Sequence, residues 1–177
     1  MHVLQAERGT ALSKSAPHRR AVTLLISFAL AIIAIDNLSK TLALNNLGPN
    51  PKQILGSFLE LQLAHNSGAA FNLAQSATIF LSLLSFLAIA ALVVFSRSLT
   101  SRIWGVALGL LMGGIAGNLV DRIFRPPYLL HGEVVDWIRL PHWPIFNLAD
   151  TSIVISAITI AILLLNDVKP RSRHDVP

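Results

Sequence analysis

Two aspartates lie within or beside apolar sequence, where ordinary surface acids are uncommon. Asp136 sits inside the run VVDWI at 134–138, and Asp150 follows FNLA directly before a long apolar stretch. Two carboxyl groups held close together do not both ionise readily, so they share one proton. One carboxylate can then take a proton from water while the other polarises a peptide carbonyl. We therefore predict that Asp136 and Asp150 form a catalytic pair of the aspartyl peptidase type, with no metal or other cofactor.

Each of the two aspartates also has a simpler explanation when it is taken alone. Asp150 stands near the start of a predicted helix, where a carboxylate can cap free N–H groups. Asp136 could instead be neutralised by Arg139. A metallopeptidase is a further alternative, although the chain has no HExxH helix. Its ligands would be Asp136 and Asp150 together with His131, Glu133 and His142.

A second group of polar residues precedes the second apolar run. Asp36 and Lys40 are four residues apart, which predicts an ion pair on one helix face, with Lys40 extending outward to the membrane surface. The alternative is that they border a site. Asn66 and Gly68 fit either a turn or a site. A weaker alternative makes Ser67 a nucleophile activated by Lys40.

A third group lies where the third apolar run ends. Asn118, Asp121 and Arg122 are spaced so that all three project toward one place on a helix. An Asp–Arg pair at a helix end is often structural, but the guanidinium fork can also hold a backbone carbonyl or a carboxylate. We predict that these three residues support or position a substrate.

The composition is that of a small integral membrane protein. Of the 177 residues, 53% are hydrophobic and 13% are charged, which is too apolar for a soluble domain of this size. The absence of cysteine excludes disulfides and thiol chemistry. The formal net charge is +5, but basic residues gather at the ends of apolar runs, so we expect no nucleic-acid partner.

Four apolar runs are long enough to cross a bilayer, which needs about 20 residues for each crossing. We predict spans at 21–44, 74–95, 103–120 and 148–165, and a strand at 54–63. Small residues four apart allow close helix packing in the third span. We expect a disordered cytoplasmic tail at 1–20, a membrane domain at 21–167 and a basic cytoplasmic tail at 168–177. The third span holds Gly105, Gly109, Gly113, Gly114 and Gly117.

The distribution of positive charge predicts that both termini are cytoplasmic. With that orientation nine of the fourteen Lys and Arg residues lie inside and five lie outside, in agreement with the positive-inside rule. All the candidate site residues then lie at the extracytoplasmic end. A proton-coupled transporter is the main alternative function, but no charge lies in the middle of the second, third or fourth span. The inner residues are Arg8, Lys14, Arg19, Arg20, Arg97, Arg102, Lys169, Arg171 and Arg173.

Five blocks of sequence, in this order, resemble the motifs of the lipoprotein signal peptidase family, also called signal peptidase II. They are DNLSK at 36–40, NSGAAF at 66–71, GGIAGNLVDR at 113–122, VDW at 135–137 and FNLAD at 146–150. The resemblance covers about residues 20–166. The tryptophan at 137 stands where phenylalanine is expected in many relatives.

The resemblance implies a bacterial inner-membrane aspartyl endopeptidase with four transmembrane helices, a small extracytoplasmic β-cradle and a short outer helix. Such an enzyme removes the signal peptide from prolipoproteins just before a diacylglyceryl-modified cysteine. Its other partner is membrane lipid, and we expect a monomer. The resemblance assigns catalysis to Asp136 and Asp150. It assigns supporting roles to Asp36, Lys40, Asn66, Gly68, Asn118, Asp121, Arg122 and Asn147.

Overall fold

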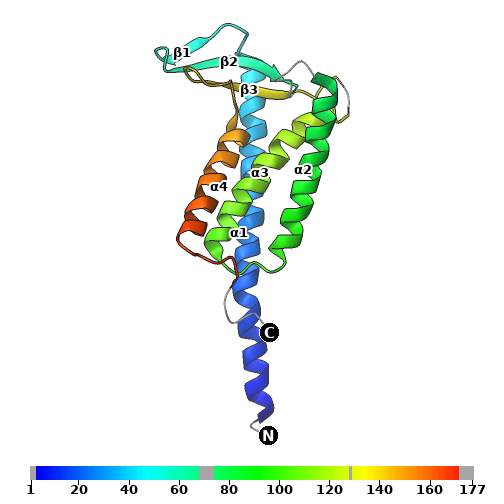
Figure 1. Ribbon diagram of the computed structural model, residues 1–177, viewed down its shortest axis with the longest axis vertical. Coiled ribbons are helices and arrows are strands. Elements are labelled where there is room, and N and C mark those ends of the chain that lie inside the picture. The colour runs from blue at the N-terminus through cyan, green and yellow to red at the C-terminus, as the bar shows by residue number, and fades with distance from the viewer. Residues whose placement is uncertain (1–2, 68–73, 128, 172–177) are drawn as a thin grey trace.

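The computed structural model describes residues 3–67, 74–127 and 129–171. Four helices lie side by side, and a small sheet lies across one end of the bundle (Figure 1). We call this the sheet end, and the opposite end, where residues 97–101 join α2 to α3, the loop end. The helices are α1 (Val3–Asn46), α2 (Ala74–Ser96), α3 (Arg102–Phe124) and α4 (Leu148–Leu165).

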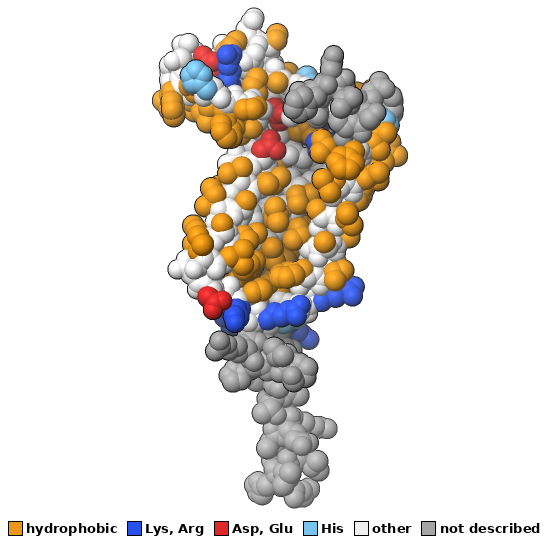
Figure 2. All heavy atoms as spheres, in the orientation of Figure 1, with side chains coloured by type: hydrophobic (Ala, Val, Ile, Leu, Met, Phe, Trp, Pro, Cys, Tyr) orange, Lys and Arg blue, Asp and Glu red, His pale blue; other side chains and the backbone are white. Residues whose placement is uncertain are grey.

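Each helix contains a segment long and apolar enough to cross a membrane, namely Pro17–Asn46, Thr78–Ser96, Arg102–Phe124 and Leu148–Leu165. The shortest has 18 residues and is about 27 Å long, close to the thickness of the hydrocarbon core. Hydrophobic side chains cover the visible flank of the bundle, and Lys and Arg side chains line its loop end (Figure 2). The prediction of a multi-pass membrane protein with four apolar helices is confirmed.

The first helix is longer than its predicted span. α1 begins at Val3, so residues 3–20 are helical and continuous with the span, which differs from the disordered tail that we expected. Residues with good helix propensity, such as Ala, Leu, Lys and Arg, dominate this stretch, and Pro17 does not end it. The boundary between a tail and a membrane domain at residue 20 stays a prediction.

α3 is the central helix, and its glycines let its neighbours approach closely. A Cβ at Gly109 would lie 2.6 Å from the backbone oxygen of Leu25 on α1, and one at Gly114 would lie 2.5 Å from that of Ala149 on α4. The predicted close packing through small residues is therefore confirmed. Near the loop end the buried hydrophobic cluster comprises Ala21, Leu25, Leu99, Trp104, Ala107, Leu108 and Leu163.

The sheet has three antiparallel strands in the order β1 (Lys52–Leu55), β2 (Leu59–Asn66) and β3 (Val134–Arg139). The single strand predicted at 54–63 was wrong, because the chain turns back at Gly56, whose φ of 55° suits a residue without a side chain. In β3, Asp136 pairs with Ala64 and Val134 pairs with Asn66. This register brings Asn66 close to Asp136.

Two expectations concern parts of the sheet end that the described elements do not include. Gly68 lies in residues 68–73, which are outside the described residues. The short outer helix implied by the family resemblance is not among the elements of the described residues. The sheet itself agrees with the predicted β-cradle.

Candidate active site

The two candidate catalytic aspartates meet at the sheet end through Asn147. Asp136 comes from β3 and Asp150 from the first turn of α4. The side-chain amide of Asn147 donates to Asp136 Oδ1 at 2.6 Å, and its backbone N–H donates to Asp150 Oδ2 at 3.3 Å. One residue thus holds one oxygen of each carboxylate, so the aspartates predicted from distant parts of the sequence lie in one cluster.

Asp136 is 2% exposed, and both its oxygens accept hydrogen bonds. Besides the bond from Asn147, Oδ2 accepts from Asn66 Nδ2 at 3.0 Å. Burial raises the pKa of Asp136 to about 6, and the negative charge of Asp150 contributes to that rise. The hydrogen bonds from Asn66 and Asn147 and the charge of Lys40 oppose it. Asp136 therefore retains a proton at a higher pH than an ordinary aspartate.

Asp150 both caps its helix and takes part in the polar cluster. Asn147 is the N-cap residue, and its Oδ1 accepts from the Asp150 N–H at 2.9 Å, which completes a capping box. The capping explanation is therefore correct for one carboxylate oxygen of Asp150. The other oxygen, Oδ1, accepts from Asn118 Nδ2 at 2.7 Å. Asp36 also caps this end of α4, because its Oδ1 accepts from the Ala149 N–H at 2.9 Å.

Lys40 is the cation at the centre of the cluster. Its ammonium group lies 2.7 Å from Asp36 Oδ2 and 2.8 Å from Asp121 Oδ2, and it donates to Asn118 Oδ1 at 3.0 Å. The predicted Asp36–Lys40 ion pair is confirmed, but the outward extension of Lys40 was wrong, since its side chain is 0% exposed. Acceptors from α1 and α3 replace water around the ammonium group. Among the described residues, Ser67 is not one of its partners.

Asp121 and Arg122 connect α3 to the rest of the site. Asp121 Oδ2 accepts from the Val135 N–H at 3.3 Å, which fastens β3 to α3, and Oδ1 pairs with Arg125. Our sequence reading missed Arg125, although its spacing of four from Asp121 is a signal for such a pair. Arg122 Nη1 donates to the Asn118 carbonyl at 3.2 Å, while its buried Nε has no hydrogen-bond partner among the described residues.

The alternatives that drew on neighbouring residues are not supported. Arg139 donates to Gln62 Oε1 at 2.8 Å and lies 3.5 Å from Glu60, so it does not neutralise Asp136. His131 bonds the carbonyl of Leu129 at 3.0 Å. Within residues 3–67, 74–127 and 129–171, no three His, Asp or Glu side chains gather in an arrangement that could hold a metal ion.

The completed cluster is a continuous polar network in otherwise apolar surroundings. Carboxylates, amides and one ammonium group from α1, β2, α3, β3 and α4 contact each other in pairs. Figure 2 shows acidic side chains at the junction between the sheet and the bundle. Two neighbouring carboxyl groups, one of them with a raised pKa, can activate water and protonate a leaving group. The network comprises Asp36, Lys40, Asn66, Asn118, Asp121, Asp136, Asn147 and Asp150.

The chain is similar to known proteins over most of its length. A family model described as Signal peptidase (SPase) II matches residues 28–166. The lipoprotein signal peptidase of Rhodococcus jostii (strain RHA1) is 39% identical over 163 residues, covering 92% of this chain and 82% of the relative. That of Mycobacterium avium (strain 104) is 40% identical over 156 residues, covering 88% of this chain and 85% of the relative.

Two solved structures, both described as a bacterial membrane enzyme, are also similar to the chain. One has a TM-score of 0.73 at 29% identity, covering 82% of this chain and 95% of the other. The second has a TM-score of 0.71 at 28% identity, covering 88% and 96% respectively. The similarity therefore extends from the sequence to the whole fold.

Proposed function

This chain belongs to the signal peptidase II family, and on that premise we propose that it cleaves prolipoproteins just before a diacylglyceryl-modified cysteine, using Asp136 and Asp150. Its relatives indicate a peptidase, and its four apolar helices indicate a multi-pass membrane protein. One observation carries the proposed mechanism. The two carboxylates are joined through Asn147 at the end of the membrane-spanning bundle, where a lipid-anchored peptide can meet water.

In the proposed reaction the pair holds one proton. Asp150 takes a proton from water as the water oxygen bonds to the scissile carbonyl carbon, while Asp136 donates its proton to the carbonyl oxygen. The resulting diol then collapses. Its hydroxyl returns a proton to Asp136, the C–N bond breaks, and Asp150 passes its proton to the leaving nitrogen. The products are a signal peptide with a new carboxyl end and a lipoprotein with a free amino group on its lipidated cysteine.

The environments of the two aspartates support this division of roles. Burial raises the pKa of Asp136 to about 6, so Asp136 is the member that retains the shared proton. Asp150 accepts hydrogen bonds from Asn118 and from the start of α4, where the positive end of the helix dipole favours a carboxylate. We therefore assign the base to Asp150 and the acid to Asp136.

The surrounding residues would hold the pair and the substrate. Lys40 forms ion pairs with both Asp36 and Asp121, which keeps α1 and α3 aligned. Within the described part of the chain the buried Nε–H of Arg122 has no acceptor, and we propose that it donates to a carbonyl of the bound peptide. Asn66 and Asn118 orient the carboxylates. Gly68 stays a predicted member of the site.

We place the enzyme in the bacterial inner membrane as a monomer, with both termini in the cytoplasm and the sheet end outside. The nine-to-five distribution of Lys and Arg supports this orientation. An acyl chain and an apolar signal helix can reach the site laterally from the bilayer. Reporter fusions at 45–66 and 129–147 should register outside the cytoplasm, and an inside signal from either would contradict the orientation.

The decisive experiment compares cleavage of a diacylated precursor and its non-acylated counterpart by purified protein. Asp136→Asn and Asp150→Asn should each lower the rate by about 10²–10⁴-fold, since each removes a group that transfers a proton. The matched control is Asp167→Asn, which makes the same change at an exposed position beyond α4. Thermal unfolding of all three variants separates loss of catalysis from loss of fold.

Two results would overturn different parts of the proposal. Full cleavage by either Asn variant would remove the catalytic pair while leaving the family assignment in place. Equal cleavage of the two precursors by the unaltered protein would remove the requirement for the lipid on the cysteine.

A further inference from the structure

The loop end carries a second charged site, far from the candidate active site. A hollow of about 420 Å³ opens there between the first turns of the α1 span and the start of α3, and basic side chains line it together with Thr23 and Leu24. Among the residues that the structure describes, three arginines and no acidic residue border it. Its lining comprises Arg19, Arg20, Thr23, Leu24 and Arg102.

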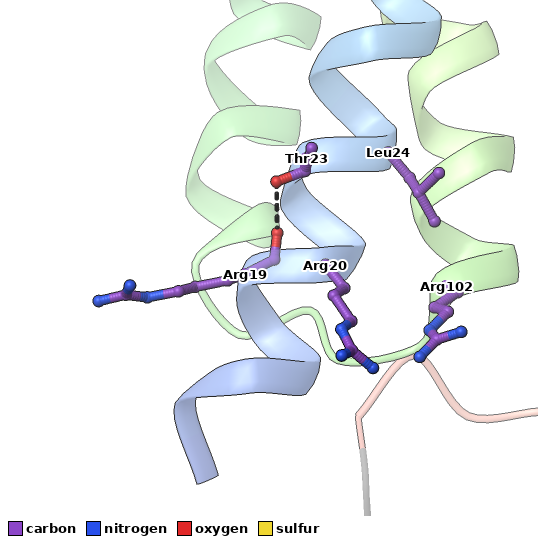
Figure 3. Close-up of a pocket in the computed structure, with 5 residues that line it drawn as sticks. All are labelled: Arg19, Arg20, Thr23, Leu24 and Arg102. Carbon is purple, nitrogen blue, oxygen red and sulfur yellow. Dashed lines mark hydrogen bonds between the residues drawn. The ribbon is translucent and has the colours of Figure 1, made fainter. Parts of the chain in front are cut away.

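The arginines differ in direction. Arg20 and Arg102 extend toward each other beneath Leu24, whereas the guanidinium of Arg19 points away from them (Figure 3). No ion pair joins any of the three to an acidic side chain among the described residues. Two neighbouring guanidinium groups without a counter-ion repel each other, so they favour an anion between them.

The backbone around the hollow is held in position. Gly105 of α3 packs directly against the Ala21 backbone, and a Cβ there would clash with the Ala21 carbonyl oxygen. Arg20 directly precedes Ala21 on α1, and Arg102 lies about one turn before Gly105 on α3. The close approach of the two helices therefore brings both arginines to the same hollow. His18 Nδ1 also bonds the Leu99 carbonyl at 2.9 Å, which ties α1 to the α2–α3 connection.

We propose that this hollow binds the headgroup of an anionic phospholipid from the leaflet at the loop end. The phosphate would lie between Arg20 and Arg102, and the glycerol and first methylene groups would pack on Leu24 and the Thr23 methyl group. The site lies where the apolar run of α1 begins, which is the depth of lipid headgroups. Basic pockets between transmembrane helices recognise such headgroups.

Charge and lining argue against other occupants. The basic start of a signal peptide would be repelled by the arginines. A free phosphate would use the guanidinium groups but leave the apolar wall uncovered. An anionic phospholipid satisfies both parts of the site, and its binding does not depend on the peptidase reaction at the sheet end.

The test measures thermal unfolding of the whole protein in vesicles of phosphatidylcholine alone and in equimolar phosphatidylcholine and phosphatidylglycerol. Phosphatidylglycerol should raise the unfolding midpoint of the unaltered protein. Arg20→Gln and Arg102→Gln should each weaken the apparent lipid affinity by about tenfold, as expected for the loss of a direct charge-assisted hydrogen bond to the phosphate. Arg97→Gln, which removes an exposed arginine of the loop end outside the hollow, should change little.

A second arm titrates inorganic phosphate into the protein in phosphatidylcholine vesicles. We expect no rise in the midpoint. An equal rise with phosphate would assign the site to a free anion and overturn the lipid proposal. An equal loss in Arg97→Gln would show a general surface field instead of a site, and no response to phosphatidylglycerol in the unaltered protein would remove the proposal altogether.

Discussion

The sheet end and the middle of the bundle are built from the same helices, but they are held together differently. At the sheet end, α1, α3 and α4 meet through buried ions and amides, with Lys40 between Asp36 and Asp121. Farther along, the same helices meet through glycine and small apolar residues. The polar contacts there are single hydroxyls, such as Ser156 Oγ, which donates to the Ala107 carbonyl at 2.7 Å.

The two regions differ because each must hold its helices together without water. Lipid does not drive helices together by hydrophobic burial, so the middle of the bundle depends on close van der Waals contact. Buried charges at the sheet end are costly unless each has its partner. Such a cluster is a poor way to gain stability, so its presence is better explained by chemistry.

The largest effect should come from removing the central cation. Lys40→Met leaves Asp36 and Asp121 buried without their shared partner, which should lower the free energy of unfolding by about 3–5 kcal/mol. Lys52→Met, at an exposed position of β1, is the matched control and should change little. Denaturant unfolding in detergent measures both. Equal free energies of unfolding for the two variants would mean that Lys40 contributes no more to stability than an ordinary surface lysine.

A smaller effect should come from the glycine contacts. Gly109→Ala sets a methyl group against the Leu25 backbone oxygen and the Phe28 Cβ, at 2.6 and 2.9 Å, so the helices must move apart. We expect a loss of about 1–3 kcal/mol in unfolding free energy. Activity should persist, because the polar cluster lies elsewhere. Gly48→Ala meets nothing within 4 Å and serves as the control; similar unfolding midpoints for the two variants would mean that α1 and α3 tolerate separation.

The mildest change concerns the proton of the proposed catalytic pair, Asp136 and Asp150. The pKa of Asp136 is about 6, so kcat/KM should fall as the pH rises through that region and the pair loses its proton. Asn66 donates to the Asp136 carboxylate and stabilises its charged form. Asn66→Ala should therefore raise the pKa and move the alkaline limb to higher pH.

The pH–rate profile of kcat/KM measures this shift, because it reports groups of the free enzyme. Asn46→Ala is the control, since the Asn46 side chain bonds within α1, to the Leu42 carbonyl at 2.8 Å. A limb that moves to lower pH in Asn66→Ala would contradict the assignment of the retained proton to Asp136.

The sequence alone was sufficient for the spans and for the residues that make up the polar cluster, whose roles in catalysis stay a prediction. Apolar runs of membrane length leave a helix as the only local structure that satisfies their backbone in lipid, so α2, α3 and α4 were predicted closely. The spacing of four between Asp36 and Lys40 likewise determined their ion pair. The ion pair depends on two residues that are close in the sequence, and the spans depend on the surrounding lipid.

The tertiary structure decided which groups from distant segments meet. Nothing local indicates that Lys40 turns inward to Asp121 and Asn118, or that Asn147 bridges two carboxylates. The hairpin at Gly56 was also missed, because alternation of apolar residues continues through the turn. The charge of Lys40 is stable in the interior only because α1 and α3 bring their acceptors together, and a linear sequence does not specify that approach.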